Sequence, residues 1–164
     1  MTELPESAER AFERHDAFVR EDDGYDLTTT PFDVRATATG PGDDRPAFEV
    51  TVRLPTLDAV VASETVPPVV EDGWYDTLSL RLEDSFDPTK TVDHEEPSVA
   101  RNGETVVATF SYRSGRAKTG VEDAKVLAEF VEGTYVQGLI PGYDYEEPAA
   151  NLLTTATNGG GGGW

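Results

Sequence analysis

Residues 105–137 read TVVATFSYRSGRAKTGVEDAKVLAEFVEGTYVQ, and the two periodicities of protein secondary structure follow one another within them. Over 105–112 apolar and polar side chains alternate, which predicts a β-strand with one buried face. Over 117–137 apolar residues recur every three or four positions, which predicts an amphipathic helix. A half-buried strand that leads into a long helix favours a sheet covered by helices.

Two hairpins extend this sheet toward the N-terminus. Asn102-Gly103 separates strand-like runs at 92–100 and 105–112, and Asn-Gly strongly favours a tight hairpin turn. Alternation over 32–38 and 48–54, on either side of a Gly/Pro/Asp-rich turn, predicts a second antiparallel hairpin. Two further strands are expected at 57–62 and, on an edge, at 25–29.

Apolar spacing predicts two more helices, at 6–20 and 71–86. The expected fold is therefore α+β, with an antiparallel sheet of about five strands covered by about three helices, in the order α-β-β-β-α-β-β-α. We expect a single domain over 1–149. The glycine-rich end, 150–164, is expected to form a flexible tail.

The charge of the chain is strongly negative. Its 164 residues include 32 acidic and 13 basic side chains, a formal net charge of −19. Such a charge excludes binding to duplex nucleic acid or to an anionic membrane through a basic face. Lysine and isoleucine are also rare, with three lysines against ten arginines and one isoleucine against seventeen valines. We expect a halophilic protein whose carboxylates are screened by solvent K⁺ and Na⁺ counter-ions.

The compartment is predicted from what the chain lacks. It contains no cysteine, which excludes disulfides, thiolate catalysis and cysteine-based metal sites. The N-terminal residues have neither the basic nor the apolar region of a secretory signal. No apolar run approaches the ~20 residues of a membrane-spanning helix. The expected location is the cytoplasm.

One positive cluster offers a candidate anion site: Arg113, Arg116 and Lys118, between the strand and the helix described first. This position suits a phosphate-binding loop, because the amides at a helix N-terminus favour anions. The Walker pattern nevertheless fails, since it needs glycine where Tyr112 and Ala117 stand. The alternative is that these cations only balance neighbouring carboxylates.

No catalytic residues, metal ligands or cofactor loop are predicted. Asp93-His94-Glu95-Glu96 offers ligand atoms, but the only other histidine is His15, and neither HExxH nor EF-hand spacing occurs. No G-x-S-x-G motif supports a serine hydrolase. These observations favour a non-enzymatic protein with no metal and no cofactor.

A loop with exposed aromatic residues is the candidate partner site. Tyr143 and Tyr145 follow Ile140 in a Pro/Gly-containing segment, and loop aromatics often mark protein-binding surfaces. The alternative is that they fold back and cap the sheet.

Three segments carry a resemblance to a known family: PFDVRATATGPGDDRPAFEVTVRLPTLDAVV (31–61), GWYDTLSLRLEDSF (73–86) and YRSGRAKTGVEDAKVLAEFVEGTYVQGLIPGYDYEEP (112–148). On these residues nearly the whole chain resembles an uncharacterised haloarchaeal family that is known as a domain of unknown function. The element order is also similar to the type III secretion chaperone-like fold. That resemblance implies a surface that holds partner segments.

The leading functional hypothesis is a protein–protein interaction or chaperone-like module, as a homodimer or with another protein. One alternative is a regulatory domain that binds a small anionic ligand through Arg113, Arg116 and Lys118. Another is an enzyme whose active site is not visible in the sequence.

Overall fold

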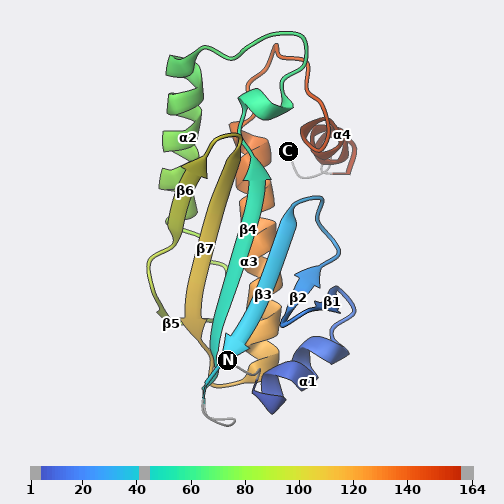
Figure 1. Ribbon diagram of the computed structural model, residues 1–164, viewed down its shortest axis with the longest axis vertical. Coiled ribbons are helices and arrows are strands. Elements are labelled where there is room, and N and C mark those ends of the chain that lie inside the picture. The colour runs from blue at the N-terminus through green and yellow to red at the C-terminus, as the bar shows by residue number, and fades with distance from the viewer. Residues whose placement is uncertain (1–4, 41–44, 160–164) are drawn as a thin grey trace.

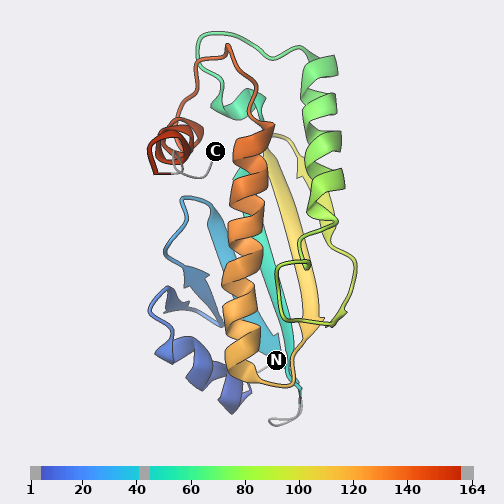
Figure 2. The same ribbon diagram turned by 180° about the vertical axis from the view of Figure 1, so that it is seen from behind.

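A β-sheet and the helices on one of its faces form the two layers of the computed structural model, which describes residues 5–40 and 45–159 (Figures 1 and 2). Within these residues there are four α-helices, one 3₁₀ turn and seven strands, in this order: α1 (Glu6–Arg14), β1 (Phe18–Glu21), β2 (Gly24–Leu27), β3 (Asp33–Thr39), β4 (Ala47–Pro55), η1 (Asp58–Val60), α2 (Pro68–Leu82), β5 (Asp93–His94), β6 (Ser98–Asn102), β7 (Thr105–Arg113), α3 (Ala117–Gly138) and α4 (Ala149–Gly159). The α+β class and the antiparallel sheet are confirmed. The expected totals of about five strands and three helices are wrong.

The sheet has the strand order β1-β2-β3-β4-β7-β5, and β6 also pairs with β7. Every pairing is antiparallel. The longest pairing joins β4 to β7, from Ala47↔Arg113 to Pro55↔Thr105. Because strand side chains alternate between faces, one set from β4 is buried under the helices and the other points to the opposite face. The Asn102-Gly103 hairpin is confirmed as the β6–β7 turn.

Helix α3 runs along the sheet and provides much of the buried layer (Figure 2). Its core residues include Val121, Leu127 and Val131, each at most 1% exposed. Close to its start the helix backbone at Gly120 approaches Phe48 of β4, and the Tyr112 hydroxyl of β7 donates a hydrogen bond to Gly120 O at 2.6 Å. The expected helix over 117–137 is thus confirmed.

The first helix is shorter than the expected 6–20. It ends at Arg14, His15 adopts an extended conformation, and Phe18 begins strand β1. The apolar residues at 18 and 19 fit a helical spacing, but Phe18 packs edge-on against Phe12 at 5.2 Å as part of the β1–β2 hairpin. Tyr25 of β2 stacks on the same Phe12 ring at 4.5 Å. The free energy gained by burying this aromatic cluster exceeds what continuation of the helix to residue 20 would contribute.

The expected strand over 57–62 is wrong. Residues 58–60 form the 3₁₀ turn η1, and only Val61 makes a bridge, to Tyr145. The Asp58 carboxylate explains the turn, because it accepts a hydrogen bond from Val66 N at 2.7 Å and closes the loop before α2. Side chains of this type favour local turns over strand pairing.

Two other boundaries differ from the expected ones. Helix α2 begins at Pro68, whose ring suits the first helical position, and ends at Leu82 rather than at residue 86. The expected strand over 92–100 is divided into β5 and β6, with Pro97 between them. Proline lacks the amide that a continuous ladder needs, which explains the interruption.

Helix α4 occupies residues for which the sequence predicts a flexible tail. Ala149 is fully buried and Leu152 is 6% exposed, so the beginning of this helix packs against the core. Residues 160–164, the rest of the expected tail, lie outside the described residues. The single-domain boundary at 149 stays a prediction.

Three tyrosines of the core make the fold sensitive to alkali. Burial, with a hydrogen bond to the Glu13 carboxylate, raises the pKa of Tyr25 to about 12 from 10.0. Burial also raises the pKa of Tyr112 and of Tyr135. Above about pH 10 the folded state therefore holds more protons than the unfolded chain, and stability falls as the pH rises through about 12.

We expect these three phenols to ionise only together with alkaline unfolding. A titration that follows phenolate absorbance and circular dichroism would test this. Titration of all six tyrosines of the chain near their ordinary pKa, with the fold intact, would contradict the burial of these side chains.

Among the described residues, no helix combines the length and the apolar character needed to cross a membrane.

Candidate functional site: the open face of the sheet

One face of the sheet is not covered by any described helix, and we call it the open face (Figure 1). It consists of the outward side chains of four strands, namely Asp33, Arg35, Thr37 and Thr39 from β3, Ala47, Glu49, Thr51 and Arg53 from β4, Thr105, Val107, Thr109, Ser111 and Arg113 from β7, and Ser98, Ala100 and Asn102 from β6. Most of these side chains are small, and hydroxyl groups are frequent among them.

Strand register aligns the hydroxyl side chains in rows. Thr51 lies opposite Thr109, which in turn lies opposite Ser98. In the next row Ser111 lies opposite Glu49. Threonine suits these positions because its β-branched side chain favours strands while its hydroxyl remains hydrated. The rows form a smooth polar surface across the middle of the sheet.

The charge of the open face differs from that of the whole chain. Three arginines and two acidic residues give it a net charge of +1, whereas the chain carries −19. The acidic excess is therefore located elsewhere.

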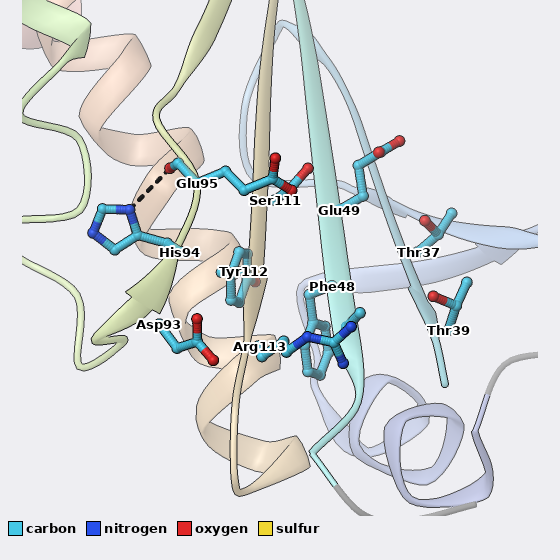
Figure 3. A pocket seen from close by; sticks show the side chains of 11 residues that line it. Thr37, Thr39, Phe48, Glu49, Asp93, His94, Glu95, Ser111, Tyr112 and Arg113 are labelled. Carbon is cyan, nitrogen blue, oxygen red and sulfur yellow. Dashed lines mark hydrogen bonds between the residues drawn. The ribbon is translucent and has the colours of Figure 1, made fainter. Parts of the chain in front are cut away.

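A cavity of about 390 Å³ lies at the end of the open face next to β5 (Figure 3). Thr37, Thr39 and Ser111 contribute hydroxyl groups to its lining, and Arg113 contributes a guanidinium. At the rim, Arg45 forms an ion pair with Asp93 at 2.9 Å. Hydroxyl, guanidinium and carboxylate groups give this cavity donors and acceptors for polar ligands or for side chains of a partner.

His94 and Ser111 both line the cavity without forming a catalytic pair. The His94 ring stacks on Phe86 at 3.9 Å, and its Nδ1 lies 2.9 Å from Glu95 O. In Figure 3 the ring lies away from Ser111, while the Glu95 side chain extends toward it. A general base acts within hydrogen-bond reach of the proton that it removes, whereas the His94 ring contacts Phe86 and Glu95. Over 5–40 and 45–159, no group of three or more His, Cys, Asp or Glu residues is placed to hold a metal ion.

The predicted anion-binding residues lie at different places. Arg113 belongs to the open face, whereas Lys118 lines a second cavity between α1 and α3. Arg116 is the exposed N-cap residue of α3 and makes no side-chain capping bond. The structure thus assigns Arg113 and Lys118 to separate cavities.

The predicted partner-binding loop folds back on the chain. The Tyr145 hydroxyl donates to Ile140 O at 2.8 Å and accepts from Ile140 N at 2.7 Å. Tyr143 packs edge-on against Tyr145 at 6.3 Å, and all three side chains are half-buried against the core. Backbone hydrogen bonds fix the loop to residues 60–62, including Ala62 N to Asp144 O at 2.7 Å. A role of these residues in partner binding stays a prediction.

The open face was missed by sequence reasoning that followed only the apolar half of each alternating strand. The polar half of the same pattern contained the signal. Thr37, Thr51, Thr109 and Ser111 occupy outward positions where an acidic chain would be expected to place more carboxylates.

Comparison with known proteins identifies a family that matches the chain. No curated protein and no solved structure matches the chain. A family of unknown function, DUF5813, matches residues 13–155, from the end of α1 into α4, and so includes the whole open face. The chain therefore belongs to the DUF5813 family.

Proposed function

We propose that this chain is a non-enzymatic protein–protein interaction module whose open face binds a second copy of the same chain. The observation that carries the proposal is the nearly neutral, hydroxyl-rich open face in a chain with a net charge of −19. Elsewhere, approach of two copies would bring excess carboxylates together. We expect the electrostatic repulsion between two copies to be smallest when their open faces meet.

The charges of the open face suit self-association. A two-fold interface brings the same surface of both copies together, so it is favoured when that surface contains groups of both signs. Arg53 and Glu49 lie on β4, and Asp33 lies on the neighbouring strand β3, opposite Arg53. Arginines of one copy thus have carboxylates of the other copy to meet. A uniformly acidic or basic partner would find no such match.

The size of the open face lies at the lower end of the range for specific interfaces. The nine-residue strands β4 and β7, at ~3.3 Å per residue, extend about 30 Å, and the four strands of the open face, spaced ~4.8 Å apart, give a width of about 19 Å. The resulting footprint of at most about 570 Å² is close to the ~600 Å² that each partner buries in the smallest standard interfaces.

Salt should strengthen this association. Two copies still repel one another through their other surfaces, and the Debye length falls to ~3 Å at about 1 M salt. We accordingly propose that the acid excess is an adaptation to high salt and that pairing takes place under those conditions.

Light scattering during size-exclusion chromatography in about 2 M KCl tests the proposal. The wild-type chain should have twice the mass of 17.8 kDa. The double variant Thr51→Glu/Thr109→Glu should be monomeric, because the new carboxylates would be buried with like charge at the centre of the interface, where salt screens little, and this weakens the interface by about 100-fold or more.

Thr77→Glu/Thr154→Glu is the matched control, since both threonines are exposed on α2 and α4, away from the open face. This variant should remain dimeric, and circular dichroism should show that all three proteins are folded. A monomeric wild-type chain, or a Thr51→Glu/Thr109→Glu variant that keeps the double mass, would overturn the proposal.

A further inference from the structure

A second cavity, of about 440 Å³, lies on the helical side of the molecule between α1 and the first turns of α3. Figure 2 shows these two elements side by side at the lower end of the molecule. The cavity has the volume of a small-molecule site, which in proteins begins at roughly 300 Å³. It is separate from the open face, so a ligand bound here would be independent of the proposed self-association.

Cationic side chains gather around this cavity. Arg10 and Arg14 come from α1 and Lys118 from α3, so three of the thirteen lysines and arginines of the chain line it. Arg10 forms an ion pair with Glu6 at 2.7 Å. Within the described part of the chain, Arg14 and Lys118 form no ion pair, although the chain carries more than twice as many acidic as basic residues.

His15 adds a neutral donor. Its Nδ1 accepts a hydrogen bond from Ala17 N at 3.2 Å, which requires the proton of the neutral ring to be on Nε2. The ring is also held edge-on to Phe18 at 5.2 Å. His15 is among the residues that line the cavity, and Nε2–H is the hydrogen-bond donor of its ring.

The remaining lining is largely apolar. Ala11 and Ala117 contribute half-buried methyl groups, and Ser7 and the almost fully buried Val121 also line the cavity. Glu122 is the carboxylate that lines the cavity. The combination of cationic and methyl groups in one lining favours an anion with an apolar body, because inorganic anions gain nothing from the methyl groups.

We propose that this cavity binds a small organic carboxylate. The carboxylate lies between Arg14 and Lys118, near His15, and the apolar body of the ligand packs on the half-buried methyl groups of Ala11 and Ala117. Guanidinium groups bind carboxylates in a bidentate manner, which favours Arg14 as the main contact.

Amide chemical shifts measured during titration with hexanoate, in about 1 M KCl, test this site. Saturable shifts are expected at residues 14, 118 and 121, with a dissociation constant in the range of about 1 mM. Hexylammonium, which has the same chain and the opposite charge, should give no saturable shift. Arg14→Gln and Lys118→Gln should each weaken hexanoate binding by about tenfold.

Arg81→Gln is the matched control, because Arg81 is exposed on α2 and distant from this cavity in the fold. It should bind hexanoate like the wild-type chain. Three results would each overturn the proposal: no saturable shift with hexanoate, equal binding of hexylammonium, or undiminished binding by both the Arg14→Gln and Lys118→Gln variants. None of them bears on self-association through the open face.

Discussion

Replacement of Gly120 by alanine is expected to lower the free energy of unfolding by about 3 kcal/mol. A Cβ atom at this position would lie 2.3 Å from Cε1 and 2.4 Å from Cζ of Phe48. The Phe48 ring has little room to move, because it stacks on Tyr112 at 5.3 Å and packs against Phe12 at 6.1 Å. Relief of the overlap therefore requires α3 to move away from β4.

Gly133→Ala, in the same helix, is the matched control. No atom lies within 4 Å of a Cβ built there, so alanine should add only its higher helix propensity, about 0.5–1 kcal/mol of stability. Urea unfolding of both variants, followed by circular dichroism, measures the two effects. Equal stability of Gly120→Ala and the wild-type chain would contradict the close packing of α3 on the sheet.

Replacement of Asp123 by alanine is expected to cost about 2–4 kcal/mol. This carboxylate is 2% exposed and lies on the buried side of α3. It accepts a hydrogen bond of 2.6 Å from Thr91 Oγ1 and bonds of 3.2 Å to each oxygen from Lys90 N. Alanine would remove the acceptor for both donors and release the segment between α2 and β5 from the helix.

Thermal unfolding measures this loss, and hydrogen exchange at the Lys90 amide locates it. Asp123→Asn keeps one acceptor oxygen and should lose less stability. Asp76→Ala, at an exposed position on α2, should stay within about 0.5 kcal/mol of the wild-type chain. If Asp123→Ala matched Asp76→Ala, the buried hydrogen bonds would have no structural importance.

The central strands could be predicted because each of them is buried on only one face, so that apolar and polar residues alternate along the sequence. In β4 and β7 every second residue is buried, and this alternation is visible in the sequence. The same holds for the apolar side of α3. Such patterns reflect contacts that nearly any sheet-and-helix packing would make.

The remaining elements depend on particular long-range contacts. Phe18 fits either a helix or a strand by its spacing, and only its packing against Phe12 decides for β1. Helix α4 follows a loop and was not recognised, because the burial of Ala149 and Leu152 depends on where that loop leads the chain.

The candidate sites also depend on contacts that the sequence pattern does not reveal. Arg14 and Lys118 are far apart in the sequence, and the docking of α1 beside α3 brings them to one cavity. Arg113 and Lys118 are close in sequence, yet they line different cavities. Proximity along the chain was thus a poor guide to proximity in the fold.

Distance measurement between spin labels on two copies tests the central claim most directly. The chain has no cysteine, so Ala100→Cys, at the rim of the open face, and Glu129→Cys, on the exposed side of α3, each provide a unique attachment site. If two open faces meet, with sheets about 10 Å apart, labels at residue 100 should lie within about 30 Å of one another. Labels at residue 129 should be separated by more than about 40 Å, because both helical layers lie between them. Absence of any intermolecular distance, or a shorter distance at residue 129 than at residue 100, would contradict pairing through the open face.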